Sequence, residues 1–138
     1  MRRGRILAVD YGTKNVGLAC SDELAVTVRP LHSVPHLGSK RLLARIKSTI
    51  LENQIDQLVI GVPWNMDGTA GEGVKRINGF MELLRQELSI PVEGVDERLS
   101  SVEAFDLWNG MTARQRRRYR TIDSLAAVII LQRFIDEC

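Results

Sequence analysis

The feature of this sequence that most constrains its fold is a pair of short apolar runs that flank a cluster of turn residues. The runs cover Ile6 to Asp10 and Val16 to Cys20, and Gly12-Thr13-Lys14-Asn15 lies between them. Partly β-branched runs on either side of a turn predict a β-hairpin. Ala25 to Arg29 alternates and stops at Pro30. This pattern predicts a third strand, so we expect the chain to begin with a three-strand antiparallel meander.

The rest of the chain alternates between helical and strand patterns. The predicted elements are a helix from Ser39, a strand over Gln57 to Val62, a second helix over Val74 to Leu88, a strand over Ile90 to Val95, a third helix that stops at Gly110 and a closing helix from Thr121. The dense apolar strand over Gln57 to Val62 is typical of a parallel strand covered on both faces. The sequence therefore predicts an α/β fold, in which a mixed sheet, the meander plus parallel strands, is flanked by helices.

Composition limits the class of protein further. With 138 residues, of which 44% are hydrophobic, the chain can form one core, and we expect a single domain over residues 1–138. Cys20 and Cys138 have neither disulfide nor metal-ligand spacing. The apolar run before Asp10 is far shorter than a signal-peptide core or the roughly 20 residues of a membrane span. We therefore expect a cytoplasmic protein with no membrane partner.

Three carboxylates from distant parts of the chain are candidate catalytic residues. Asp10 shares a pleat face with Ile6 and Ala8, so it emerges on an otherwise apolar face that a helix would cover. Glu97 follows another strand, and Asp123 falls in the first turn of the closing helix. Converging carboxylates repel unless a cation neutralises them, and hard oxygen ligands favour Mg²⁺ or Mn²⁺. Such a site suits phosphodiester hydrolysis by two metal ions.

Each acid also has a structural explanation. Asp10 could shape a turn, Asp123 could be a first-turn acid favoured by the helix dipole, and Glu97 could pair with Arg98. The segment from Asp10 to Thr13 also suits nucleotide phosphates, although 138 residues leave little room for the second lobe of an ATPase. A metal-dependent nuclease, a non-catalytic nucleic-acid-binding factor and, less favoured, a small ATPase all stay open.

Basic residues near the acids are candidates for binding nucleic acid. The segment Arg114 to Arg120 carries five arginines in seven residues, and we expect it to form a basic loop just before Asp123. The predicted phosphate contacts are Lys14, Arg98, Arg114, Arg116, Arg117, Arg118 and Arg120. A solvated surface segment is the plain alternative. Trp64 and Met66 would either touch an unstacked base or pin their loop. His32 and His36 have no evident partner.

Four blocks of the sequence resemble the YqgF family, also called RuvX or Holliday-junction-resolvase-like proteins. VDYGTKNVGLACSD resembles the family's opening strand pair, VIGVPWNMDGTAGEG its mobile loop, VDERLSSVEA its acidic strand end, and TIDSLAAVIILQ its closing helix. The resemblance covers nearly the whole chain. It implies a ribonuclease-H-like fold and a nuclease that matures the 5′ end of pre-16S rRNA, with resolution of Holliday junctions as the alternative.

The same resemblance implies roles for individual residues. Asp10, Glu97 and Asp123 would be the metal-binding and catalytic acids, with Mg²⁺ or Mn²⁺ as cofactor, and Asp96 is the neighbour most easily confused with Glu97. The implied partner is structured RNA, with DNA junctions less favoured. The protein could act as a monomer or as a homodimer.

Overall fold

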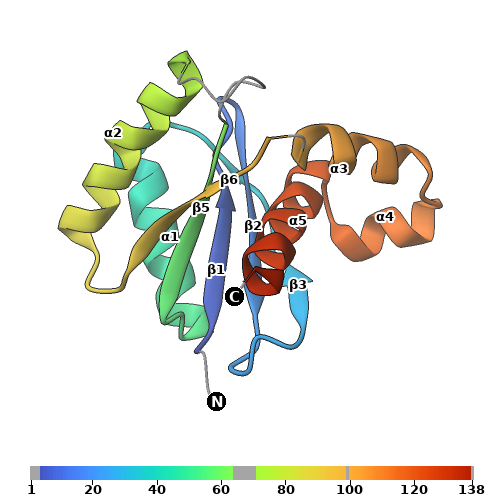
Figure 1. Cartoon of the computed structure of the whole chain (residues 1–138), viewed down its shortest axis with the longest axis horizontal. Coiled ribbons are helices and arrows are strands. Elements are labelled where there is room, and N and C mark those ends of the chain that lie inside the picture. Colours follow the sequence, from blue (N-terminus) through green and yellow to red (C-terminus); the bar gives the residue numbers. More distant parts are fainter. Residues whose placement is uncertain (1–3, 64–70, 99, 138) are drawn as a thin grey trace.

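One mixed sheet forms the centre of the computed structural model, which describes residues 4–63, 71–98 and 100–137 (Figure 1). The strands are β1 (Ile6–Asp10), β2 (Asn15–Ser21), β3 (Val28–Pro30), β4 (Val34–Pro35), β5 (Gln57–Val62) and β6 (Val92–Asp96). The helices are α1 (Ser39–Asn53), α2 (Glu72–Glu87), α3 (Ser100–Asn109), α4 (Ala113–Tyr119) and α5 (Ile122–Asp136). The strand order is β3-β2-β1-β5-β6, and β4 pairs with the start of β2.

The strand pairing confirms the predicted mixed sheet. β1, β2 and β3 form an antiparallel meander, whereas β5 is parallel to both β1 and β6. The third strand was predicted to begin at Ala25, but β3 begins at Val28. Asp22 explains the difference, because its Oδ1 accepts hydrogen bonds from the backbone N–H groups of Val26 (2.7 Å) and Thr27 (3.1 Å) and holds this segment in a turn. The short strand β4 was not predicted.

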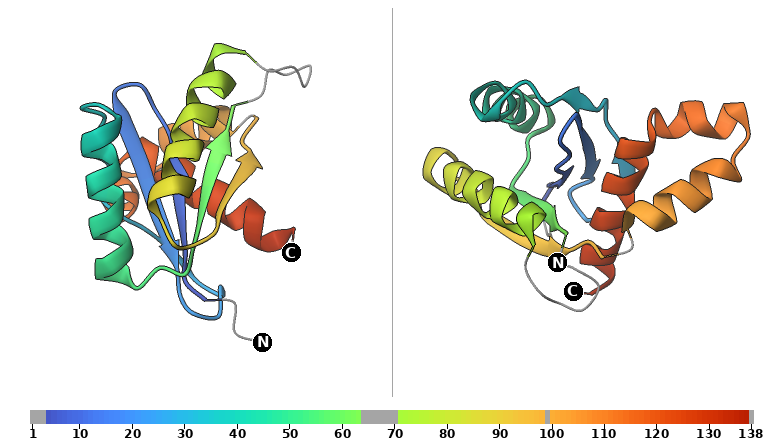
Figure 2. Two further views of the ribbon diagram at one scale, coloured as in Figure 1. Left: turned by 90° about the vertical axis from the view of Figure 1, so that its left-hand side faces the viewer. Right: turned by 90° about the horizontal axis from the view of Figure 1, so that it is seen from above.

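Helices cover both faces of the sheet (Figure 2). α1 and α2 pack on one face, where Leu7 and Val9 of β1 belong to the same buried apolar cluster as Ile46 and Leu84 of the two helices. α5 covers the other face, and α3 and α4 pack against the outer side of α5. The predicted burial of the closing helix on most sides is therefore confirmed. Within the described residues, no helix is both long and apolar enough to cross a lipid bilayer.

The basic segment before Asp123 is a helix, and the prediction of a loop was wrong. Thr112 and Gln115 form a capping box: the Thr112 hydroxyl accepts from the Gln115 backbone N–H (3.2 Å), and the Gln115 side chain accepts from the Thr112 N–H (2.8 Å). This reciprocal pair satisfies two donors that a helix start would leave unpaired. The arginines of this segment are therefore presented on α4, a fixed helix, rather than on a loop.

Candidate active site

The three candidate acids come from three elements that end or begin at the C-terminal end of the parallel strands. Asp10 is the last residue of β1, Glu97 follows β6 directly, and Asp123 lies in the first turn of α5. Ile6 and Ala8 pack with residues of α5, as the pleat predicted, so Asp10 ends its strand on the face that α5 covers. The fold thus brings together the ends of elements that lie far apart in the sequence.

A glycine on β2 allows α5 to begin close to Asp10. Gly17 is the cross-strand partner of Asp10. A Cβ atom at position 17 would lie only 1.9 Å from the backbone oxygen of Asp123. Any other residue would therefore push the first turn of α5 away from the sheet. The absence of a side chain at Gly17 brings Asp123 to the candidate site.

A second glycine makes room for Glu97. β5 lies between β1 and β6, so Glu97 must reach across β5 to approach Asp10. A Cβ atom on Gly61 of β5 would lie 2.6 Å from Glu97 Oε2, which shows that the carboxyl group occupies the space above this glycine. The backbone N–H of Glu97 donates to the Val62 oxygen (3.1 Å) and extends the pairing of β5 with β6. Glu97 is fixed at both its backbone and its side chain.

The acids perturb one another. Burial, the negative charge of Asp10 and a hydrogen bond between the two side chains together raise the pKa of Glu97 to about 9. Burial also raises the pKa of Asp10; the hydrogen bond from Glu97 opposes this shift, and the charge of Asp123 adds to it. Burial raises the pKa of Asp123 as well. At neutral pH and without a cation, Glu97 is therefore protonated and donates a hydrogen bond to Asp10.

The chemistry of these residues fits a divalent cation. Glu97 is only 7% exposed, and its Oε2 is a buried oxygen without a hydrogen-bond partner among the described residues. Such an oxygen normally has a partner, and a hard cation would supply one. Asp10 offers a second carboxyl group in contact with Glu97. Within the described ranges, however, no three His, Cys, Asp or Glu side chains are grouped around one ion position. The predicted site of three acids therefore stays a prediction.

The neighbouring acid Asp96 has a different environment. Its carboxylate accepts hydrogen bonds from the backbone N–H (2.9 Å) and the Nε (2.8 Å) of Arg98, and an Arg98 Nη2 lies 2.7 Å away. These bonds lower the pKa of Asp96. The ion pair that sequence reasoning considered for Glu97 and Arg98 is thus made by Asp96. Arg98 was predicted to contact phosphate, but its guanidinium is already paired with the Asp96 carboxylate.

The predicted basic residues on and after α4 fall into two groups. Arg114, Arg117 and Arg118 are exposed. Arg116 is half-buried: its guanidinium carbon lies 5.3 Å from the centre of the Trp108 ring, and its Nε donates to the Trp108 oxygen (3.0 Å). Arg116 therefore has a structural role in joining α4 to α3. The exposed group remains available to a nucleic acid.

Two further predicted basic residues are close to the acids in the sequence. Arg120 precedes α5, and its Nη1 lies 2.6 Å from Nε2 of His32, which ties the end of α4 to the segment after β3. Lys14 is exposed in the turn that follows Asp10. His36 also has a partner that sequence reasoning missed, because its Nε2 lies 2.9 Å from the Tyr11 hydroxyl. Trp64 and Met66 lie outside the described residues.

Comparison with known proteins identifies the family. A family model described as "RuvX: Holliday junction resolvase" matches residues 4–137. A "Putative pre-16S rRNA nuclease" of Clostridioides difficile (strain 630) is 40% identical over 137 residues, which cover 99% of this chain and 96% of that protein. A protein of the same name from Koribacter versatilis (strain Ellin345) is 35% identical, with coverage of 96% and 87%.

Solved structures show the same fold. The fowlpox virus Holliday junction resolvase has a TM-score of 0.62 at 16% identity and covers 97% of this chain and 99% of that chain. Thermus thermophilus RuvC in complex with Holliday junction substrate has a TM-score of 0.58 at 13% identity, with coverage of 98% and 96%. These similarities confirm the ribonuclease-H-like fold. Since the family model and the relatives span nearly the whole chain, the protein belongs to the RuvX family.

Proposed function

We propose that this protein is a metal-dependent endonuclease that processes the 5′ end of pre-16S rRNA. The observation that carries the proposal is the contact between the half-buried Asp10 and the buried Glu97, whose carboxyl groups share a proton at the end of the sheet where α5 begins. Structural carboxyl groups are rarely buried together without a cationic partner. The name of the relatives supplies the substrate class.

Each acid has a role in this proposal. Asp10, Glu97 and Asp123 would hold Mg²⁺ or Mn²⁺, whose chemistry is to polarise water and to neutralise charge on the scissile phosphate. Glu97 would release its proton on metal binding, because the cation's charge favours the carboxylate. Water is then the nucleophile, with no covalent intermediate, and the product carries a 5′ phosphate.

The exposed arginines of α4 and Lys14 would hold the RNA backbone near these acids. Arg114, Arg117 and Arg118 have no carboxylate partner within the described part of the chain, so their charges are available to phosphates. Their position, just before the helix that carries Asp123, suits a strand that enters the site from the α4 side. Processing of a ribosomal RNA precursor agrees with the cytoplasmic location that the sequence predicts.

Resolution of Holliday junctions is the second candidate. The family description and the fold shared with RuvC favour it. A non-catalytic RNA-binding factor would use the same basic residues without the acids. A small ATPase would use the turn after Asp10.

One set of assays separates these functions. Wild-type protein is compared with Asp10→Asn, Glu97→Gln and Asp123→Asn on a precursor rRNA, on a four-way DNA junction and on ATP, each with Mn²⁺ or with a chelator. Asp96→Asn is the matched control, because this acid lies beside Glu97 but is paired with Arg98. We expect metal-dependent RNA cleavage that falls roughly a hundredfold or more in the three variants and stays near wild type in the control.

The other outcomes redirect the assignment. Equal cleavage by all proteins would remove the acids from the mechanism. Cleavage of junctions but not of RNA would indicate a resolvase. Metal-independent RNA binding that tolerates Asp10→Asn, without cleavage, would indicate a binding factor, and ATP hydrolysis without nucleic acid would indicate an ATPase.

A further inference from the structure

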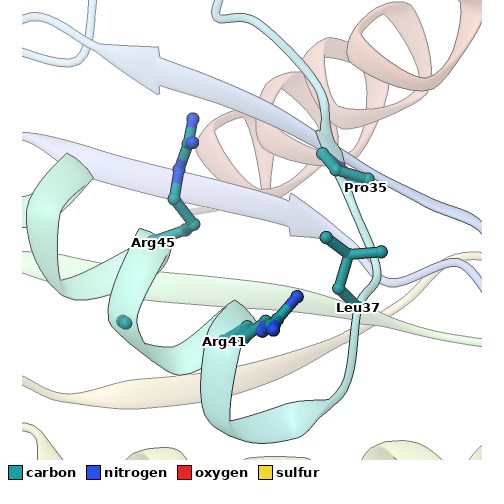
Figure 3. Close-up of a pocket in the computed structure, with 5 residues that line it drawn as sticks. Pro35, Leu37, Arg41 and Arg45 are labelled. Atoms are coloured by element: carbon teal, nitrogen blue, oxygen red, sulfur yellow. The ribbon is translucent and has the colours of Figure 1, made fainter.

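A cavity beside the start of α1 lies outside the acidic site. Its volume is about 310 Å³, which is large enough for a small ligand. It is lined by Pro35, Leu37, Arg41, Ala44 and Arg45, so its walls combine apolar side chains with two arginines and contain no acid (Figure 3). The side chain of Leu37 is 59% exposed, so a ligand in the cavity could contact it directly.

The two arginines of the cavity have unneutralised charges. Arg41 and Arg45 lie one helical turn apart and project from the same side of α1 (Figure 3). Within the described residues, neither guanidinium has an ion-pair or hydrogen-bond partner. The first turn of α1 also contains no acidic residue and has no side-chain cap. The helix dipole therefore adds positive potential at this end, and the cavity favours an anion.

The cavity is connected to the turn that follows Asp10. Pro35 pairs with Asn15 in the β2–β4 ladder, and the backbone N–H of His36 donates to the Lys14 oxygen (2.8 Å). The contact between the His36 ring and the Tyr11 hydroxyl fixes the same segment from the other side. The wall of the cavity thus begins at the turn that carries Lys14. A nucleic acid bound at the acids could continue along Lys14 into the cavity.

α1 and α4 lie on opposite sides of the sheet (Figure 2). The exposed arginines of α4 are on the side of α5, whereas Arg41 and Arg45 are on the side of α1 and α2. A substrate that crosses the end of the sheet where the acids lie would therefore meet arginine side chains on both sides. The α4 surface offers charges alone, but the α1 cavity offers charges around an apolar floor.

From these observations we propose that the α1 cavity binds one unpaired nucleotide of the substrate strand, with the base against Leu37 and Pro35 and the flanking phosphates on Arg41 and Arg45. The inference rests on the proposed action on nucleic acid. A nucleobase has flat π faces and lies between anionic phosphates, and both apolar side chains and guanidinium planes stack on those faces. A paired base could not enter, because its faces are covered by neighbouring base pairs. The cavity therefore selects RNA that is single-stranded beside the cleavage site.

The test compares two RNAs in the Asp10→Asn background, which prevents cleavage during the measurement. One is a short blunt duplex, and the other is the same duplex with a single-stranded extension at one end, both fluorescently labelled. We expect the extended RNA to bind roughly tenfold or more tightly. Leu37→Ala and Arg41→Ala/Arg45→Ala should remove this preference while leaving the affinity for the blunt duplex nearly unchanged. For the arginine variant, the slope of the log binding constant of the extended RNA against log salt concentration should become shallower by about 0.7 per lost phosphate contact.

Three controls make the result specific. Lys47→Ala removes a charge from the same helix outside the cavity, at a residue paired with Glu87, and should keep the preference. Arg41→Lys/Arg45→Lys keeps the charge but loses the planar guanidinium, so it should restore the salt dependence and only part of the preference. Thermal unfolding checks that each variant is folded.

The remaining outcomes separate this inference from the proposed function. Equal affinity for both RNAs, or a preference that survives the Leu37 and arginine substitutions, would overturn the inference even if the wild-type protein cleaves RNA. Tight, cavity-dependent binding of free AMP without any preference for the extension would overturn it as well. A preference that depends on the cavity, in a protein that cleaves no RNA, would support the cavity and refute the nuclease.

Discussion

Glu97 links the stability of the fold to pH through its buried carboxyl group. Its pKa is about 9 in the folded protein, against 4.5 for an ordinary glutamate carboxyl group. Between these two pH values the folded state binds a proton that the unfolded state has lost. The free energy of unfolding therefore falls as pH rises through this window, by up to about 1.4 kcal/mol per pH unit from this group.

Glu97→Gln should remove this dependence. In the presence of a chelator we expect the variant to be more stable than wild type at pH 8 and the difference to grow between pH 5 and pH 9, as measured by urea unfolding. Asp96→Asn is the control. Because Arg98 lowers the pKa of Asp96, the contribution of Asp96 to the free energy of unfolding is present above pH 3.8 and is lost only at more acidic pH. Parallel curves for Glu97→Gln and wild type would mean that Glu97 is ionised in the folded protein without metal.

At the scale of elements, the position of α5 depends on Gly17. Gly17→Ala would place a Cβ against the backbone of Asp123, and a backbone cannot move aside as a flexible side chain can. We expect a loss of about 1–3 kcal/mol in unfolding free energy together with a loss of cleavage, because Asp123 moves away from Asp10. Gly79→Ala in α2 is the matched control. Nothing lies within 4 Å of a Cβ there, so a stability gain of up to about 1 kcal/mol and unchanged cleavage are expected.

We expect only the exposed arginines of α4 to bind RNA. Arg117→Ala/Arg118→Ala should weaken binding. The slope of the log binding constant against log salt concentration should become shallower by about 0.7–0.9 per lost phosphate contact. Arg116→Ala should lower the melting temperature instead, since its guanidinium packs on Trp108 and binds its carbonyl oxygen. Fluorescence titrations at several salt concentrations and thermal scans measure both effects. A salt dependence that Arg116→Ala changes as much as the double variant would show that all these arginines face the RNA.

Elements with a strong local pattern could be predicted from the sequence, and elements without one could not. The apolar runs of β1, β2 and β5 and the buried α5 were predictable, because their burial depends on local patterns that a core requires. α4 was missed because five arginines suggested a solvated loop, although Thr112 and Gln115 already carried the signal for a helix start. The two-residue strand β4 has too short a pattern to be recognised and depends on its partner β2.

The candidate site was predictable only as a set of residue types. Asp10 and Glu97 follow recognisable apolar runs and Asp123 precedes one, but how near they lie to one another depends on the strand order, in which β5 separates β1 from β6. Gly61 and Gly17 remove the side chains that would keep the acids apart, and nothing in their local sequence distinguishes them from turn or strand glycines. A sequence pattern predicts which face a residue occupies, whereas contacts across a sheet are determined by the whole fold.

At the scale of the whole molecule, the number of active sites needed distinguishes the two candidate substrates. The three candidate acids of one chain come from elements that begin or end at the same end of one sheet, so a monomer would hold one candidate site. Maturation of an RNA 5′ end requires one cut, for which a monomer is sufficient. A four-way junction requires two cuts in symmetric strands, for which two copies related by a two-fold axis are needed.

We therefore expect the protein to sediment as a monomer under the conditions in which it cleaves precursor RNA, and the cleavage rate to rise linearly with protein concentration. The same samples are examined by analytical ultracentrifugation with and without a four-way DNA junction, and the junction is labelled on each strand in turn. An assembly of two chains on the junction, together with paired cuts at symmetric positions, would contradict the assignment to RNA. A rate that rises with the square of protein concentration on RNA would mean instead that the RNA site itself is completed by a second copy.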